Sequence, residues 1–240
     1  MRRTLVLSAV CWFAAGTAVS APPCEGVVFY ESLEAWRAVT DRELLAVTFD
    51  EPSWPVNTPL FGVWTVAGVS FQGFAGAPAP NIWVSDFGSP FLTGRWLVAN
   101  GDENIDVTPS GPTHAIGLDA GSNGLGPATV KVFGDGGELL ASLTIDAGTA
   151  RFVGITSVQA INHLNFSSTL GAIVDTGFDN IRLASYPVAV VGDLNGDGQV
   201  NAADLAMLLG GWGGEGEADL DCDGVVGPAD LGVLLGAWTG

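Results

Sequence analysis

Basic residues are scarce in this chain of 240 residues. Lys and Arg together number 8 against 26 Asp and Glu, and Lys131 is the single lysine. A net charge of −18 repels a polyanion, and no cluster of basic side chains offsets that repulsion locally. The composition therefore argues against a nucleic-acid partner and favours divalent cations as counterions.

Cysteine and histidine are also few, with three Cys and two His in the whole chain. Beyond residue 21 only Cys24 and Cys222 remain, which allow one disulfide or none, so hydrophobic packing must supply the core. The sequence contains no Gly-x-Ser-x-Gly, His-Glu-x-x-His or Cys-x-x-Cys motif and no phosphate loop with its lysine. The histidines, His114 and His163, lie within strand patterns. We therefore predict that the protein is not an enzyme.

The first 21 residues have the pattern of a secretory signal peptide. Arg2 and Arg3 precede an apolar stretch over residues 5–15, and small residues follow. The apolar stretch is far shorter than the roughly 20 residues that a membrane span needs. We expect cleavage, secretion to the extracellular space or cell surface, and no transmembrane anchor.

Residues 25–184 alternate between apolar and polar positions, with Gly, Pro, Asn and Asp breaks every few residues. This pattern predicts a mainly β fold, an antiparallel jelly-roll-like sandwich. A hairpin is expected from residues 129–132 and 139–145, and a short helix over residues 32–40 should cover one end. The other strands are predicted at residues 45–50, 69–74, 96–99, 104–108, 115–119, 151–155, 160–166 and 177–183.

Several short motifs in this region resemble the jelly-roll domains of secreted bacterial surface proteins. They are YESLEAW at residues 30–36, VTFD at 47–50, GVSF at 68–71, GLD at 117–119 and FDNI at 178–181. The resemblance implies a fold and an extracellular address, and it implies no reaction. Residues 185–191 then form a predicted linker to a C-terminal module at residues 192–240.

An internal repeat at a spacing of 26 is the strongest feature of the sequence. DLNGDGQVNAAD at residues 193–204 recurs as DLDCDGVVGPAD at residues 219–230. In a twelve-residue calcium loop, oxygen-bearing side chains at positions 1, 3, 5 and 12 and the carbonyl of position 7 bind the ion, and Gly at position 6 permits a sharp turn. Val occupies position 8 in both copies and is placed to pair across the loops. The repeat thus predicts two Ca²⁺ sites.

Each loop has its own predicted ligand set. In the first loop the ligands are the side chains of Asp193, Asn195, Asp197 and Asp204, the Gln199 carbonyl, and Asn201 directly or through water. In the second loop they are Asp219, Asp221, Asp223, Asp230 and the Val225 carbonyl, with water in place of a side chain at Gly227. The additional carboxylate in the second loop favours tighter binding there.

A one-sided helix should follow each loop, and none should precede it. The two predicted apolar stripes, which should pack on each other, are Leu205, Leu208, Leu209 and Trp212 in one helix and Leu231, Leu234, Leu235 and Trp238 in the other. The duplicated unit resembles type I dockerin modules over residues 192–240. The resemblance implies folding upon calcium binding and docking to a cohesin-like module or another cell-surface component. Loop positions 10 and 11, which are associated with partner choice, lack polar pairs here, so a structural calcium-stabilised tail or a self-association element stays open.

Two functions from different classes remain. The leading one is a secreted, non-catalytic calcium-binding protein with a docking tail and a sandwich that binds glycans. The alternative is a small polysaccharide-acting enzyme carrying a dockerin, which would use carboxylate pairs such as Asp50 with Glu51 or Asp102 with Glu103. For the sandwich, the aromatic residues Trp54, Trp64, Trp83 and Trp96 indicate glycan stacking if they are exposed and core packing if they are buried.

Overall fold

The computed structural model describes residues 26–74, 82–86, 94–99, 104–168, 176–186, 190–221 and 223–240. The predicted signal peptide, Cys24, Cys222, the Asp102–Glu103 pair and residues 187–189 of the predicted linker lie outside these ranges. None of the helices in the described part of the chain is long and apolar enough to cross a membrane.

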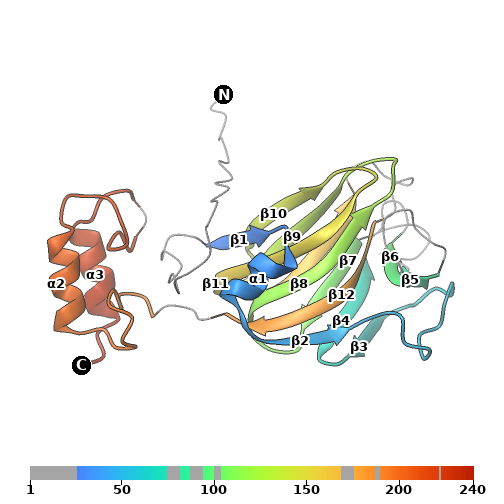
Figure 1. Ribbon diagram of the computed structural model, residues 1–240, viewed down its shortest axis with the longest axis horizontal. Helices are drawn as coiled ribbons and strands as arrows, with labels where there is room; N and C mark the ends of the chain where they lie inside the picture. The colour runs from blue at the N-terminus through green and yellow to red at the C-terminus, as the bar shows by residue number, and fades with distance from the viewer. Residues whose placement is uncertain are drawn as a thin grey trace.

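The N-terminal part is an antiparallel sheet that curls over itself (Figure 1). Its strands are β1 (Val27–Tyr30), β2 (Asp41–Val47), β3 (Val63–Val66), β4 (Val69–Phe74), β5 (Ile82–Ser85), β6 (Trp96–Ala99), β7 (Asn104–Pro109), β8 (Thr113–Ser122), β9 (Ala128–Gly134), β10 (Leu139–Ile145), β11 (Ala150–Ser168) and β12 (Thr176–Ser185). Every pairing between these strands is antiparallel. The predicted hairpin is present as β9 and β10, which confirms the sequence reading there.

Strand β11 joins the two layers of this curled sheet. Its first half pairs with β1 and β8, and its second half pairs with β7 and β9. We call β1, β8, β12, β2, β6 and β5 with the first half of β11 the front layer, and β3, β4, β7, β9 and β10 with its second half the back layer. The sequence had predicted two strands here, which was wrong. Residues 156–159 contain no Gly, Pro, Asn or Asp to break the chain, so one strand runs from its pairing with β8, which ends at Thr156, to its pairing with β9, which begins at Ile161.

The core lies between the layers and uses the alternating apolar positions of each strand. Phe49, Phe71, Phe166 and Phe178 are at most 1% exposed and contact one another through their rings. Trp54 and Trp96 are each 7% exposed, and Trp64 packs against the same core. These three tryptophans therefore pack in the core. Trp83 is half-buried, so its exposure does not decide between core packing and glycan stacking.

Helix α1 (Leu33–Val39) starts at the predicted cap, since the Ser32 hydroxyl accepts the N–H of Ala35 at 3.3 Å. It lies on the outer face of the front layer and not at an end of the sandwich, which corrects the expectation. The fully buried Trp36 explains this position, because its ring lies where a Cβ at Gly154 would be only 2.6 Å away. Its indole N–H donates to the Ile155 carbonyl at 3.2 Å.

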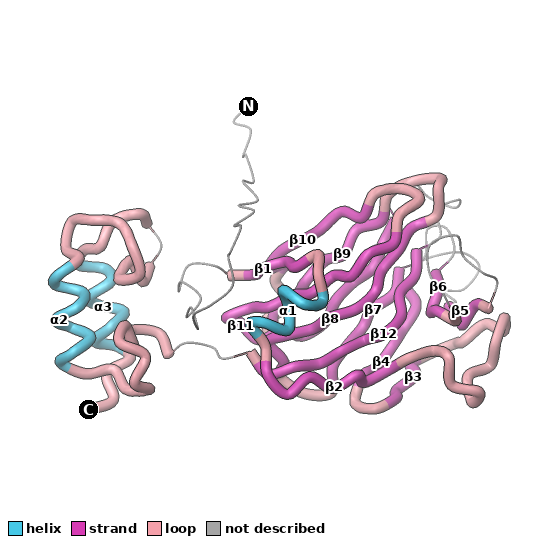
Figure 2. The backbone as a smooth tube through the Cα atoms, in the orientation of Figure 1, coloured by secondary structure: helices cyan, strands magenta, loops and turns pink. Residues whose placement is uncertain are grey.

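The C-terminal part holds two short helices side by side, α2 (Ala202–Gly210) and α3 (Pro228–Gly236), each following one repeat (Figures 1 and 2). No described residue directly before either loop is helical, as predicted. A second hydrophobic cluster holds them together. Its buried members, none of them shared with the sheet core, are Val200, Leu208, Leu220, Val226 and Leu234.

The two helices do pack on each other, but only half of each predicted Leu/Trp stripe lies in the contact. Leu208 and Leu234 are buried, and Leu205 and Leu231 pack against them. The exposed fractions of the other four are 53% for Leu209, 45% for Trp212, 53% for Leu235 and 39% for Trp238. Adjacent helical residues point about 100° apart, so one partner helix cannot cover both leucines of each pair. Val200 and Val226 of the loops complete the buried cluster.

Candidate metal site

The two repeats fold into loops with the same backbone geometry. Gly198 and Gly224, at position 6 of each loop, have φ values of +84° and +94°. Only glycine adopts this left-handed region without strain, so the predicted reason for a glycine at this position is confirmed.

Position 1 of each loop organises the turn through its carboxylate. Asp193 accepts the N–H of Gly196 at 2.8 Å on one oxygen and the N–H of Gly198 at 2.7 Å on the other. Asp219 likewise accepts the N–H of Gly224 at 2.9 Å. These hydrogen bonds bend the loop around the carboxylate.

Position 12 connects the two ends of each loop. Asp204 is fully buried and accepts the N–H groups of Leu194, Asn195 and Asn201 at 2.9, 3.2 and 2.8 Å. Burial opposes its ionisation, but these hydrogen bonds outweigh burial and lower the pKa of Asp204 below its ordinary value. The carboxylate therefore stays ionised inside the fold.

Asp230 repeats this arrangement in the second loop. Its carboxylate, 1% exposed, accepts the N–H groups of Leu220, Asp221 and Gly227 at 2.6, 3.0 and 2.6 Å. Here too the hydrogen bonds outweigh burial and lower its pKa. Asp204 and Asp230 thus hold their loops closed, in addition to the ligand role that the sequence predicts for them.

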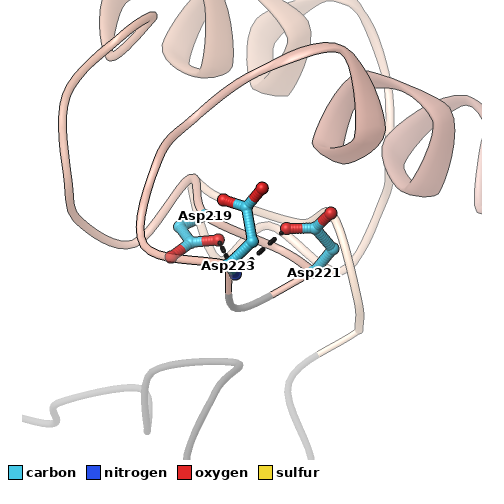
Figure 3. Close-up of side chains that lie close together, drawn as sticks. All are labelled: Asp219, Asp221 and Asp223. Atoms are coloured by element: carbon cyan, nitrogen blue, oxygen red, sulfur yellow. Dashed lines mark hydrogen bonds between the residues drawn. The ribbon is translucent and has the colours of Figure 1, made fainter.

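Three carboxylates of the second loop converge on one point (Figure 3). Asp219, Asp221 and Asp223 each place an oxygen within 4.8 Å of the other two, and both Asp219 and Asp221 accept the N–H of Asp223 at 3.2 Å. The pKa of Asp221 is raised, first by partial burial and then by the negative charges of Asp223, Asp230 and Asp219. No basic residue follows Arg182 in the chain, so nothing in this segment compensates the charge. This group of hard oxygen ligands could hold a metal ion.

The first loop differs because Asn195 replaces one carboxylate. Its amide donates to Asp197 Oδ2 at 3.0 Å, and its oxygen accepts the Asp197 N–H at 2.9 Å. Asp197 also accepts the N–H of Gln199 at 2.9 Å. Asn201, predicted as a direct or water-mediated ligand, caps α2 by accepting the N–H of Ala203 at 2.8 Å. The first loop is therefore less acidic than the second, as the sequence predicts.

The sequence reading missed how the loops are tied to each other. The position 8 valines share one hydrophobic cluster, and the backbone of each is hydrogen-bonded to a segment outside the loops. Val200 bonds to Thr239, which follows α3, and Val226 bonds to Gly213 and Gly214, which follow α2. Thr239 and Gly213 are themselves 26 residues apart, so the structural repeat extends beyond the loops and helices. This spacing is the sequence signal that could have indicated the contact.

Among the described residues of the sheet, Asp179 is a carboxylate whose pKa departs strongly from its ordinary value. Asp179, directly opposite Asp119 in the β12–β8 pairing, is 2% exposed and accepts the Phe49 N–H at 3.2 Å. Burial first, and the charges of Asp50 and Asp119 second, raise its pKa to about 6. A substrate cannot reach a carboxyl group buried to this extent.

The other candidate catalytic groups are held by their neighbours. Asp50 accepts the N–H of Arg95 at 2.8 Å. A ring nitrogen of His114 lies 3.0 Å from the Ser157 carbonyl, and the ring of His163 stacks on Phe133. Each histidine is thus held in place by a neighbour within the sheet.

No family model and no curated protein matches this chain. Among solved structures, the sheet is distantly similar to family 29 carbohydrate-binding modules. One variant of CBM29-2, in complex with cellulohexaose, has a TM-score of 0.40 at 12% identity, covering 62% of this chain and 94% of that one. Another variant, in complex with mannohexaose, has a TM-score of 0.38 at 12% identity, with coverages of 54% and 91%. The likeness concerns the strand arrangement and assigns no ligand to this chain.

Proposed function

We propose that this is a secreted, non-catalytic protein whose C-terminal segment binds two Ca²⁺ ions and serves as a docking module. The observation that carries the proposal is the second loop, in which Asp219, Asp221 and Asp223 bring carboxylate oxygens within 4.8 Å of one another. The first loop supports it, because the same hydrogen bonds fold the same repeat there.

Calcium suits these loops better than other common ions. It takes 6–8 oxygen ligands in a flexible geometry, whereas Mg²⁺ demands a near-ideal octahedron and keeps its waters. The bound ion would neutralise carboxylates that now have no basic neighbour. In the second loop Asp219, Asp221, Asp223, Asp230 and the Val225 carbonyl would hold it. In the first, Asp193, Asn195, Asp197, Asp204 and the Gln199 carbonyl would do so, with Asn201 directly or through water.

Exposed apolar side chains on the helices support a docking role. Leu209 and Leu235, and likewise Trp212 and Trp238, are equivalent positions of the repeat, and each is 39–53% exposed. Tryptophan is enriched at protein–protein interfaces, and exposed apolar patches often mark interaction sites. By resemblance to type I dockerins, the partner would be a cohesin-like module or another cell-surface component.

The calcium sites can be tested on the full secreted chain after treatment with a chelator. Calorimetric titration with CaCl₂ should show two ions bound, and Asp223→Asn should leave one. The control Asp146→Asn, an exposed aspartate of the sheet, should still bind two. A wild-type chain that binds no calcium, or an Asp223→Asn variant that still binds two ions, contradicts the proposal.

The docking role needs its own experiment. Immobilised full-length chain should retain a cohesin module in CaCl₂ and release it in chelator. Trp212→Ala and Trp238→Ala, both on exposed positions, should weaken retention without altering calcium binding. Calcium binding without any retention would leave a calcium-stabilised tail and exclude this docking partner. A dockerin-bearing enzyme is favoured instead only if the full chain hydrolyses a polysaccharide.

A further inference from the structure

The outer face of the back layer carries a straight row of polar side chains. Strand register places Gln72 of β4 opposite Asp106 of β7, Asp106 opposite Asn165 of β11, and Asn165 opposite Lys131 of β9. Residues far apart in the sequence therefore form one line across four neighbouring strands. With strands about 4.8 Å apart, the line is about 14 Å long.

These side chains point away from the core, because their neighbours along each strand point into it. Phe71, Val107, Val130 and Phe166 are each at most 1% exposed. The row residues are half-buried, so they lie along the sheet surface within reach of solvent. The corresponding outer face of the front layer is partly covered by α1 and Trp36, whereas no described helix covers the back layer.

Two groups in the row are free to bind a further molecule. Asn165 donates to Asp106 at 2.5 Å, which fixes both side chains and leaves acceptor positions on the carboxylate. The ion pairs of the described residues involve Arg37, Arg151 and Arg182, and none involves Lys131. No side-chain hydrogen bond among the described residues involves Lys131 or Gln72 either, so the ammonium group of Lys131 and the amide of Gln72 keep their donors available.

An aromatic pair borders the row. Phe133 and His163 are opposite each other in β9 and β11, two residues from Lys131 and Asn165 respectively. Their rings stack with centroids 4.5 Å apart and planes 6° from parallel. Both are half-buried, and each ring has one face that the other ring does not cover.

We propose that this row, with the Phe133–His163 pair, is a binding surface for a neutral polysaccharide. Sugar rings present hydroxyl groups that donate and accept hydrogen bonds, which amide, carboxylate and ammonium groups can match, and C–H faces that pack on aromatic rings. The line of about 14 Å suits a chain of several sugar rings better than a single one. The net charge of −18 disfavours acidic glycans. This surface lies on the sheet and is independent of the calcium loops.

Affinity electrophoresis of the full chain in hydroxyethyl cellulose, xylan and galactomannan tests the proposal. At least one of these should retard the wild-type chain. Lys131→Ala and Phe133→Ala should each weaken that binding by about tenfold, the effect of losing one good contact. The control is Gln159→Ala, at an exposed position of β11 outside the row, and this variant should bind like wild type.

The controls separate this surface from the C-terminal segment and from misfolding. Binding should persist in chelator, and Lys131→Ala should melt at the wild-type temperature because its side chain is not part of the core. Binding of none of the three polysaccharides overturns the proposal. A folded Lys131→Ala variant that binds as tightly as the wild-type chain also overturns it. If the wild-type chain loses its binding in chelator, the glycan belongs to the C-terminal segment and the proposal fails.

Discussion

Val200 and Thr239 hold the first loop against residues that follow α3. The N–H of Thr239 donates to the Val200 carbonyl at 3.0 Å, and the N–H of Val200 donates to the Thr239 hydroxyl at 2.9 Å. Val226 makes the equivalent bonds to Gly213 and Gly214 at 2.8 Å each. Each loop is thus supported by the segment that follows the other loop's helix, and the two repeats form one reciprocal unit.

This relationship predicts that Thr239→Val weakens the first loop. The substitution removes the acceptor for the Val200 N–H, at a cost of about 1 kcal/mol. Calcium affinity should fall by several-fold at the first site while the second changes less, because Val226 bonds to backbone groups of Gly213 and Gly214. Titration in an Asp223→Asn background isolates the first site. An unchanged affinity of the first site on adding Thr239→Val to that background would contradict the prediction.

Asp179 predicts a pH-dependent stability. Its pKa in the folded state is about 6, above the ordinary 3.8, so folding binds a proton between these values and stability falls as pH rises from about 4 to 6. Above pH 6 the ionised group, which faces Asp50 and Asp119 with Arg182 3.9 Å from Asp119, destabilises the fold by up to roughly 3 kcal/mol.

Asp179→Asn should therefore raise the melting temperature of the sheet at pH 7.5 and have little effect near pH 4. Asn keeps an oxygen that can accept the Phe49 N–H. Thermal unfolding followed by circular dichroism at both pH values checks this, with Asp146→Asn as the control. An equal shift at both pH values would show that the charge of Asp179 is not the cause.

Trp36 predicts a large loss of stability on truncation. The buried indole fills the space over Gly117 and Gly154 and donates to a backbone carbonyl. Trp36→Ala should destabilise the sheet by about 3–5 kcal/mol, whereas Val39→Ala, at a 36% exposed position of the same helix, should cost far less. Urea unfolding of both variants measures the difference. Similar costs for the two variants would mean that burial of the indole contributes little to the stability of the sheet.

The separate hydrophobic clusters predict independent unfolding of the two parts. No residue is shared between the core of the sheet and the cluster around Val200 and Leu234. Differential scanning calorimetry should show two transitions, and chelator should lower only the one of the C-terminal segment. A chain ending after Ser185 should keep the other transition. If chelator moves every transition together, the two parts form one cooperative unit.

The sequence by itself determined those features that depend on neighbouring residues. The Ser32 cap of α1, the β9–β10 hairpin and the helices after each repeat follow from local patterns. The two twelve-residue loops also follow from a local sequence pattern. All their proposed ligands lie within twelve consecutive residues, and Gly198 and Gly224 supply the turn that this spacing requires.

Tertiary structure decided what depends on residues far apart in the chain. Strand register alone aligned Gln72, Asp106, Asn165 and Lys131, and the unbroken length of β11 placed its two halves in different layers. Gly117 of β8 and Gly154 of β11 leave space on the face of the sheet, and the Trp36 ring occupies this space. Thr239 reached the first loop only because the two repeats pack reciprocally. A local pattern records which face of an element is apolar, but the partner of that face is chosen by packing of the whole fold.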